Sequence, residues 1–388
     1  MTDWLTKSQA EALAKKHKTP LYAYSRAGLV TRAQELLSQT SPYGFGPRYA
    51  LKANLHPDIV QLFDSLGLQF DASSEYEASH AISLGVAPEK ISLSSQQPPD
   101  NLQSVLDAGI KFVASSLHQL ELVGQTGWQG DVAIRVNPGL GSGHNNRTTT
   151  GGVGASFGIW HEYLEQVLEH QAQHAYTIDR LHVHIGSGGD VALWHSAIKA
   201  VLKLVDRLPS VTTLDMGGGY KVARISGESE VDMSKIIGVF NQELRQFCGR
   251  TGRRISLEVE PGTWLVANNG VLLSKIVDIV DTGARGFTFI KLDTGMNDFL
   301  RPSMYGAQHP IKVLNNNQTK QRYVVVGHNC ESGDLLTPAP GEPEQLQPRL
   351  LNSAKIGDLV LIGGAGAYGA SMRAVGYNSF PSANEVLI

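Results

Sequence analysis

The chain has 388 residues, of which 41% are hydrophobic and 18% are charged. That length suits two domains, and the apolar share argues against a disordered protein. A formal net charge of −3 gives no electrostatic footprint for nucleic acid or for an anionic membrane surface. The two cysteines, Cys248 and Cys330, form no disulfide framework and suit a reducing compartment. Because the N-terminal stretch is polar and no apolar run reaches membrane-spanning length, we expect a cytoplasmic protein.

Strand-like and helical patterns alternate along most of the chain. Residues 5–17 have the pattern of an amphipathic helix, and residues 21–25 have that of a short strand. Strand and helix then alternate eight times, which is typical of a (β/α)8 barrel, so we expect an α/β, TIM-like barrel over residues 26–270. The strand-like runs are 49–54, 68–73, 91–95, 112–115, 132–138, 181–186, 212–219 and 255–261. Helical patterns between them include 56–67, 75–85, 99–109, 161–171, 191–207 and 233–250.

The helical signal fades beyond residue 270. Four apolar, strand-like runs follow, separated by turn residues, and they cover 271–283, 287–295, 322–330 and 358–366. We therefore expect a second, all-β domain made of residues 1–25 and 271–388, with the early strand 21–25 joining its sheet. The proline-rich segment 337–348 is expected to be a surface loop.

Lys52 is the most unusual residue of the first strand-like run. It lies in the segment Arg48–Asn54, between apolar neighbours. A lysine buried there would lose hydration, which favours the neutral and nucleophilic amine. Such an amine can form a Schiff base with an aldehyde, and pyridoxal phosphate is the biological aldehyde that uses a lysine in this way. The alternative is a lysine at a strand end with its charged head in water.

Two histidines and a glycine run follow at the carboxyl ends of later strand-like runs. His182 and His184 alternate with apolar residues, so both should point to one face of a strand. No further ligands stand at convincing spacing, so we expect no metal; a ring stacked on a flat cofactor and a pair of satisfied core histidines remain the two alternatives. The run Gly217–Gly219 would let backbone N–H groups approach a phosphate, although such glycines also serve ordinary tight turns.

Carboxylates, a thiol and a tyrosine add further candidates. Glu258 and Glu260 alternate on one strand, and one of them near a pyridine nitrogen would keep that nitrogen protonated. The alternative for Glu260 is an exposed strand end. Cys330 is either a proton donor or an inert thiol, and Glu331 could receive a substrate ammonium. Tyr368 either reaches a phosphate or merely packs.

Longer motifs occur in one order along nearly the whole chain, namely 136–159, 293–311, 330–334 and 366–388, with the shorter runs 49–54, 182–187, 217–219 and 260–262. Together they resemble the fold-type III pyridoxal phosphate-dependent decarboxylases, and within them the diaminopimelate decarboxylases. The resemblance implies decarboxylation of meso-2,6-diaminopimelate to L-lysine and CO2, with pyridoxal 5′-phosphate as cofactor. It also implies a homodimer with active sites at the subunit interface, and no nucleic-acid or membrane partner.

The same resemblance implies roles for single residues. Lys52 would form the Schiff base with the cofactor. His184 would stack on the ring, and Glu260 would pair with the pyridine nitrogen. Cys330, a catalytic residue, and Glu331 would come from the other subunit. The remaining expected cofactor contacts are Ser187, Gly217, Gly218, Gly219, Gly262 and Tyr368, and the expected substrate contacts are Arg301, Tyr305, Glu331, Tyr368 and Arg147.

One departure bears on the substrate. Many relatives carry an arginine after the Glu-Pro-Gly motif, whereas this chain has Thr263. A threonine cannot form a two-pronged charged pair, so Arg147 or Arg301 would have to compensate. The alternatives are a decarboxylase of another basic amino acid, such as D- or L-ornithine, D-lysine or L-arginine, and a regulatory homologue without catalysis. A racemase of this fold would need a weaker electron sink than Glu260 provides.

Overall fold

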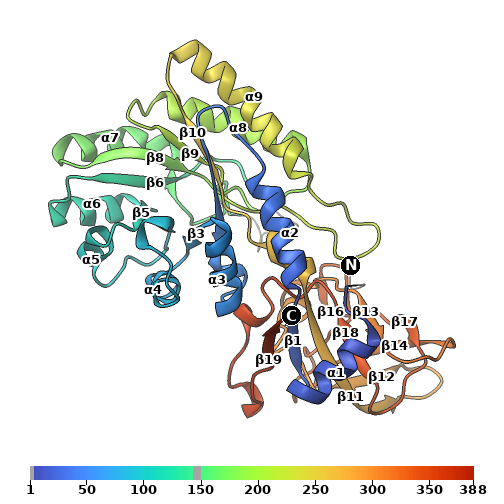
Figure 1. Ribbon diagram of the computed structural model, residues 1–388. Helices are drawn as coiled ribbons and strands as arrows, with labels where there is room; N and C mark the ends of the chain where they lie inside the picture. The colour runs from blue at the N-terminus through green and yellow to red at the C-terminus, as the bar shows by residue number, and fades with distance from the viewer. Residues whose placement is uncertain (1–3, 143–149) are drawn as a thin grey trace. The chain divides into compact units, whose positions relative to one another are not determined.

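The computed structural model describes residues 4–142 and 150–388. The chain divides into two compact units. The barrel unit comprises Val30–Lys221 and Ser229–Gly262, and the β unit comprises Met1–Leu29, Val222–Glu228 and Thr263–Ile388 (Figure 1). Among the described residues, no helix combines the length and the apolar character that a membrane crossing requires.

The barrel unit is built on eight parallel strands that close into a ring. Neighbouring strands pair in sequence order, and β10 closes the ring by pairing in parallel with β2. The (β/α)8 barrel predicted from the alternating pattern is therefore confirmed. The strands are β2 Phe45–Ala50, β3 Gln69–Ala72, β4 Ile91–Leu93, β5 Lys111–Ala114, β6 Asp131–Asn137, β8 Thr177–His182, β9 Thr213–Asp215 and β10 Ser256–Val259, with the short β7 Ile159–Trp160 paired to β6.

Helices connect these strands and cover the outside of the ring (Figure 1). Local sequence signals set their ends: Ser116 caps α6 by accepting the Gln119 N–H, and Gly127 ends it in the left-handed conformation. α8 buries Trp194, Ile198 and Val201 along one apolar stripe. The helices are α2 Arg26–Leu37, α3 Pro57–Leu66, α4 Glu75–Ser83, α5 Leu102–Asp107, α6 Leu117–Thr126, α7 Leu164–Gln173, α8 Val191–Asp206 and α9 Met233–Thr251.

Two strands lie earlier in the chain than the sequence predicts. β2 covers Phe45–Ala50 instead of 49–54, and β8 covers Thr177–His182 instead of 181–186. Lys52 consequently lies in a single 3₁₀ turn, Leu51–Ala53, which the Asn54 N–H closes onto the Leu51 carbonyl at 3.0 Å. Residues that follow the last paired position of a strand lie in turns or loops. Their side chains therefore extend from these loops and not from the sheet.

The β unit contains a mixed eight-stranded sheet. β1 pairs antiparallel with β11 and parallel with β19, so the early strand joins a sheet made largely from the C-terminal third. Helix α1 Lys7–His17, capped by Thr6, packs Ala10 into an apolar cluster with Leu21 and Val271. The strands are β1 Leu21–Tyr24, β11 Gly270–Asp281, β12 Thr288–Leu292, β13 Ile311–Val313, β14 Lys320–Val326, β17 Arg349–Asn352, β18 Leu359–Ile362 and β19 Asn384–Leu387.

The prediction of a surface loop over residues 337–348 is wrong. This segment forms a two-stranded hairpin of β15 Pro338–Ala339 and β16 Glu342–Leu346. Gly341 takes a positive φ of +77° between the two strands, a conformation that glycine adopts without strain. Proline is tolerated here because an edge strand can leave an N–H position without a ladder partner.

Candidate active site

Lys52 stands at the carboxyl end of β2, held by polar groups from the end of β3. Its Nζ donates to Asp71 Oδ2 at 2.9 Å and to Ser73 Oγ at 3.0 Å. The side chain of Asp71 is almost fully buried, whereas that of Lys52 is 38% exposed. Of the two alternatives for Lys52, the structure agrees better with a lysine at a strand end: the side chain is partly exposed, and Asp71 and Ser73 fix the direction of its amine.

Glu260 lies just beyond the end of β10 within a buried group of titratable side chains. His182 Nε2 lies 3.2 Å from Glu260 Oε2, and His182, Asp215 and Glu260 bring one potential ligand atom each within 4.8 Å of one another. Burial, followed by the charge of Asp71, raises the pKa of Glu260 to about 7. Burial lowers the pKa of His182 to about 4, so this imidazole is neutral at pH 7. These residue types also suit a metal, and its expected absence stays a prediction.

The Glu260 carboxyl is incompletely paired. Its Oε1 atom is buried and has no hydrogen-bond partner among the described residues, and the same holds for both ring nitrogens of His182. The His182–Glu260 approach is thus a close contact without hydrogen-bond alignment. A buried acceptor left in this state costs free energy, about 1–3 kcal/mol in typical cases. Glu260 is therefore poised to accept a hydrogen bond or a proton from a ligand.

The glycine run and the loop after β8 lie in backbone contact. His184 Nδ1 accepts the Gly218 N–H at 3.1 Å, and Gly188 N–H donates to the Gly219 carbonyl at 3.0 Å. Gly219 has a φ of +100°, and a Cβ atom there would overlap the Gly186 carbonyl oxygen. Only glycine permits this approach, which leaves a side-chain-free surface beside His184. The flanking Ser187 is partly exposed.

Gly262 shows the same restriction near Lys52. A Cβ atom at Gly262 would lie 2.8 Å from the Cβ of Ala53 and 3.2 Å from that of Ala50. The chain after β10 therefore passes directly over the turn that carries Lys52. Within the barrel unit, the structure brings the predicted residues Lys52, His184, Gly217–Gly219, Glu260 and Gly262 onto one end of the ring, as expected for the carboxyl ends of barrel strands.

Glu258 belongs to a different environment from Glu260. It forms a two-pronged pair with Arg48, with distances of 3.0 Å and 2.9 Å, and its Oε2 lies 3.1 Å from Arg180 Nη1. Burial raises the pKa of Glu258, but the Arg48 and Arg180 charges outweigh burial and hold it below its usual range. Glu258 is thus a neutralised core carboxylate, which leaves Glu260 as the candidate for ligand chemistry.

Five predicted residues lie on the β unit. Arg301 and Tyr305 belong to the short helix α11 Arg301–Tyr305, with the guanidinium carbon 5.9 Å from the ring centre of Tyr305. Cys330 and Glu331 follow β14 and are both exposed. Tyr368 has a positive φ of 54° in the segment after β18. The fifth candidate for substrate binding, Arg147, lies outside the described residues.

One family model matches more than half of the chain. Residues 27–267 match the family model described as "Pyridoxal-dependent decarboxylase, pyridoxal binding domain". The chain belongs to the pyridoxal-dependent decarboxylases. It is 35% identical to the diaminopimelate decarboxylase of Streptomyces coelicolor, over 97% of this chain and 86% of the relative.

Solved structures agree with that family. A crystal structure of a diaminopimelate decarboxylase matches with a TM-score of 0.91 and 31% identity, covering 99% of this chain and 92% of the other. The diaminopimelate decarboxylase of Helicobacter pylori, complexed with L-lysine, matches with a TM-score of 0.86 and 27% identity, covering 97% and 93%. The barrel together with the separate β unit is thus the architecture of this group of decarboxylases.

The barrel end of this decarboxylase fits a pyridoxal cofactor on three observations. Lys52 offers an amine that is both held and accessible. Glu260 Oε1 is a buried acceptor that lacks a partner among the described residues, as a site for a ring nitrogen requires. The loops after β8 and β9 meet in backbone contact at Gly186 and Gly219, and glycine-rich backbone of this kind allows N–H groups to approach a phosphate.

Sequence reasoning missed three charged residues of this decarboxylase site. Asp71 is the penultimate residue of β3, Asp215 ends β9 and Arg135 lies within β6, and all three are buried. Burial raises the pKa of Asp215 well above its usual value. For Arg135, burial lowers the pKa while the charges of Glu260, Asp71 and Asp215 raise it, and the net direction is down. Each is a single charge in an otherwise apolar run, which is the signal that could have identified them.

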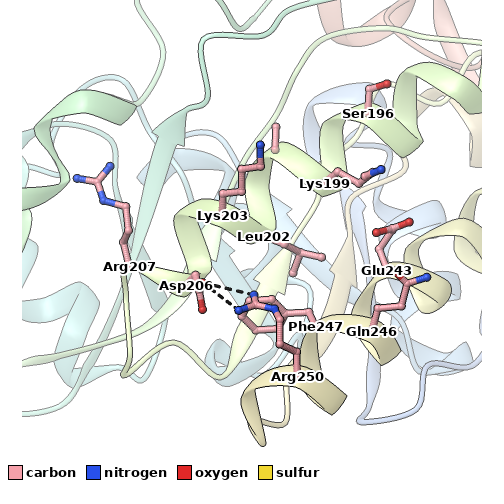
Figure 2. Close-up of a pocket in the computed structure, with 11 residues that line it drawn as sticks. Ser196, Lys199, Leu202, Lys203, Asp206, Arg207, Glu243, Gln246, Phe247 and Arg250 are labelled. Carbon is pink, nitrogen blue, oxygen red and sulfur yellow. Dashed lines mark hydrogen bonds and ion pairs between the residues drawn. The ribbon is translucent and has the colours of Figure 1, made fainter.

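The outside of the barrel unit has a groove that lies apart from the predicted site residues. It lies between α8 and α9, has a volume of about 660 Å³, and contains the Arg250–Asp206 ion pair at 3.3 Å (Figure 2). The pocket includes none of the residues predicted for the site. Its lining residues are Ser196, Lys199, Ala200, Leu202, Lys203, Asp206, Arg207, Glu243, Gln246, Phe247 and Arg250.

Proposed function

We propose that this decarboxylase converts meso-2,6-diaminopimelate into L-lysine and CO2. The observation that carries the proposal is 35% identity to a diaminopimelate decarboxylase over 97% of the chain. The partly exposed Lys52 side chain and the Glu260 Oε1 atom, which has no hydrogen-bond partner among the described residues, lie at the same end of the barrel and support it. The expected cytoplasmic location remains a prediction.

We propose pyridoxal 5′-phosphate as the cofactor, held by the barrel end. Lys52 would carry it, His184 would lie against the ring and Glu260 would pair with the ring nitrogen. When bound, pyridoxal phosphate supplies an aldehyde for the substrate amine and a ring that draws electrons away from the bond to the lost carboxylate. The backbone N–H groups of Gly217, Gly218, Gly219 and Gly262, with Ser187 and Tyr368, would surround the phosphate.

The chain's own residues would control the protons. Asp71 and Ser73 fix the direction of the Lys52 amine, which must be released and recaptured in each turnover. Glu260 would take its carboxylate form if it paired with a protonated ring nitrogen, because an adjacent opposite charge lowers an acid's pKa. Cys330 or Lys52 would return a proton to the carbon that lost CO2. His184 is partly exposed, and it would present an uncharged face to the cofactor ring, since desolvation lowers its pKa well below the usual value.

We further propose a homodimer in which Cys330 and Glu331 serve the partner's site. Both are exposed on the β unit. Glu331 accepts hydrogen bonds from the Gly333 N–H at 3.1 Å and from the Tyr377 hydroxyl at 3.2 Å, which lowers its pKa and keeps it ionised. An ionised, oriented carboxylate on an exposed loop is suited to receive a substrate ammonium.

The second candidate is a decarboxylase of another basic amino acid, such as D-lysine or ornithine. Thr263 favours it, because this position does not supply the positive charge that many relatives have. A regulatory homologue without catalysis is disfavoured, since Lys52, His184, Glu260 and Cys330 are all present.

A substrate panel tests the proposal. CO2 release from the cofactor-loaded protein is measured with meso-diaminopimelate, D- and L-lysine, D- and L-ornithine and L-arginine, with Lys52→Ala as the blank. We expect kcat/KM for meso-diaminopimelate to exceed the others by at least about a hundredfold, which is roughly 2.7 kcal/mol of transition-state discrimination. Faster turnover of a substrate with one carboxylate would replace the proposal with the second candidate.

A further inference from the structure

Two arginines of the β unit are anchored on one turn, directly after β18. Arg224 Nε donates to the Gly364 carbonyl at 3.2 Å. The preceding carbonyl, of Gly363, accepts from His309 Nδ1 at 2.9 Å, and Arg301 Nε approaches the other ring nitrogen of His309 at 3.4 Å. Consecutive carbonyls therefore hold Arg224 directly and Arg301 through His309, so the two guanidinium groups belong to one cluster.

Hydrogen bonds on both sides hold the Gly363–Gly364 turn in place. The Gly363 N–H donates to Pro310 at 2.8 Å and the Ala365 N–H to Gly270 at 2.9 Å, which fixes the backbone on both sides. Gly364 has a φ of +64°, and a Cβ atom there would lie 3.0 Å from Cγ and Cδ of Arg224. A glycine is required for the backbone angle, and its missing side chain makes room for the arginine stem.

The cluster carries more positive charge than its surroundings neutralise. In the described part of the chain, no carboxylate forms an ion pair with Arg224 or Arg301, and Arg224 Nη2 is buried without a hydrogen-bond partner. The nearby Glu228 accepts from the Arg224 backbone N–H at 2.7 Å. Burial, followed by the charge of Arg301, lowers the pKa of Arg224 to about 9. A bound anion would relieve both the lost hydration and the repulsion.

We propose that Arg224, together with Arg301, binds the carboxylate of meso-diaminopimelate at the end of the substrate remote from the reacting carbon. This inference rests on the proposed function. Arg301 is expected from the family resemblance; Arg224 is the addition, and it supplies the second guanidinium that Thr263 does not. Two guanidinium groups offer donors to both oxygens of one carboxylate, which is the geometry that favours arginine for such recognition.

The test compares Arg224→Met and Arg224→Lys with wild type and with the control Arg250→Met. Arg250 is an exposed arginine of α9, 62% exposed, paired with Asp206. Each protein, loaded with cofactor, is assayed with meso-diaminopimelate and with L-lysine, which lacks the remote carboxylate. A second readout needs no turnover: the rise in unfolding temperature that pimelate, an unreactive dicarboxylate, gives to each protein.

We expect Arg224→Met to lower kcat/KM for meso-diaminopimelate by at least about a hundredfold, while any L-lysine turnover changes by less than about threefold. Arg224→Lys should fall in between, because it keeps the charge and loses the fork. Pimelate protection should disappear in Arg224→Met and persist in Arg250→Met. Without a ligand, Arg224→Met should unfold no earlier than wild type, since it removes a buried charge that lacks an ion-pair partner.

Three results would overturn the assignment: a loss below about tenfold for meso-diaminopimelate, an equal loss with both substrates, or unchanged pimelate protection in Arg224→Met. A variant too unstable to assay would itself assign Arg224 a structural role and would count against the proposal. If wild type does not decarboxylate meso-diaminopimelate at all, the proposed function fails separately. Pimelate protection that depends on Arg224 would then still identify the carboxylate site.

Discussion

At the scale of single residues, the barrel unit buries several charged side chains and neutralises them to different extents. Glu258 is compensated by two arginines, whereas Glu260 lies beside Asp215 and Asp71 and keeps an unpaired oxygen among the described residues. Such an arrangement destabilises the protein without a ligand, because carboxyl groups are desolvated without matching cations. We interpret this unfavourable desolvation as the reason why Glu260 would be a strong hydrogen-bond acceptor for a positively charged ring nitrogen.

Glu260→Gln should therefore change how stability depends on pH in the cofactor-free protein. The folded pKa, about 7, lies above the ordinary 4.5, so the folded state binds the proton more tightly than the unfolded state. The contribution of this group is favourable below about pH 4.5 and is lost as pH rises through about 7. Urea unfolding between pH 5 and 8 should show this loss in wild type, up to about 3 kcal/mol, and not in Glu260→Gln. Glu344→Gln, at an exposed position, should follow wild type; the same slope in Glu260→Gln would contradict the assignment.

At the scale of elements, the site depends on where strands end. The strand-like runs at Lys52 and His184 extend past the paired residues, and the chemistry is carried by the 3₁₀ turn and the loops that follow. Two of those loops, after β8 and β9, touch through Gly186 and Gly219. Glycine is needed there because the two backbones are too close to leave room for a Cβ atom at Gly219.

Gly219→Ala should damage the site while leaving the barrel assembled. The new Cβ would overlap the Gly186 carbonyl oxygen, and alanine is strained at a φ of +100°. We expect at least about tenfold weaker binding of pyridoxal phosphate in an absorbance titration, with destabilisation of about 1–3 kcal/mol. Gly238→Ala is the matched control, since nothing lies within 4 Å of its Cβ and it stands in helix α9. It should bind normally and gain up to about 1 kcal/mol; equal behaviour of the two variants would show that the contact is not needed.

At the scale of the whole molecule, the predicted site is divided between the two units. Lys52, His184 and Glu260 belong to the barrel unit, whereas Arg301, Cys330 and Tyr368 belong to the β unit. A site with parts on two units can be completed within one chain or between two chains. The family resemblance favours the second arrangement for Cys330 and Glu331.

Mixing two inactive variants tests that arrangement. Lys52→Ala should abolish turnover because no second amine replaces it, and Cys330→Ala should lower turnover far more than cofactor occupancy. If the sites are shared, a mixed dimer has one site with both wild-type residues. Random exchange of equal amounts should then restore about a quarter of wild-type activity, because half of the dimers are mixed and each has one good site.

Subunit exchange is verified by native mass spectrometry on tagged chains, and mixing of two Lys52→Ala preparations is the control. Absence of recovery after complete exchange would assign Lys52 and Cys330 to a site within one chain.

The sequence by itself determined the architecture, and its motifs identified the family of decarboxylases. Strand and helix alternation specified the barrel, because each period reflects which face must be buried. The positions of Lys52, Glu260 and the glycine run indicated the reactive end, since carboxyl ends of barrel strands converge. The sequence was therefore sufficient to recognise residues whose predicted role depends only on their type and on their position at the end of one strand.

Tertiary structure decided the pairings between distant segments. That Glu258 is neutralised by Arg48 while Glu260 is not depends on contacts between residues 210 positions apart. The hydrogen bond from Lys52 to Asp71 joins the turn after β2 to β3 and was not predicted from the local sequence of either. The sequence around Arg224 does not indicate a role for this residue. Only the structure shows that Arg224 lies near Arg301 and the Gly363–Gly364 turn, and that it has no carboxylate partner among the described residues. Charge balance and burial are properties of a neighbourhood in space, so the sequence fixes them only through the fold.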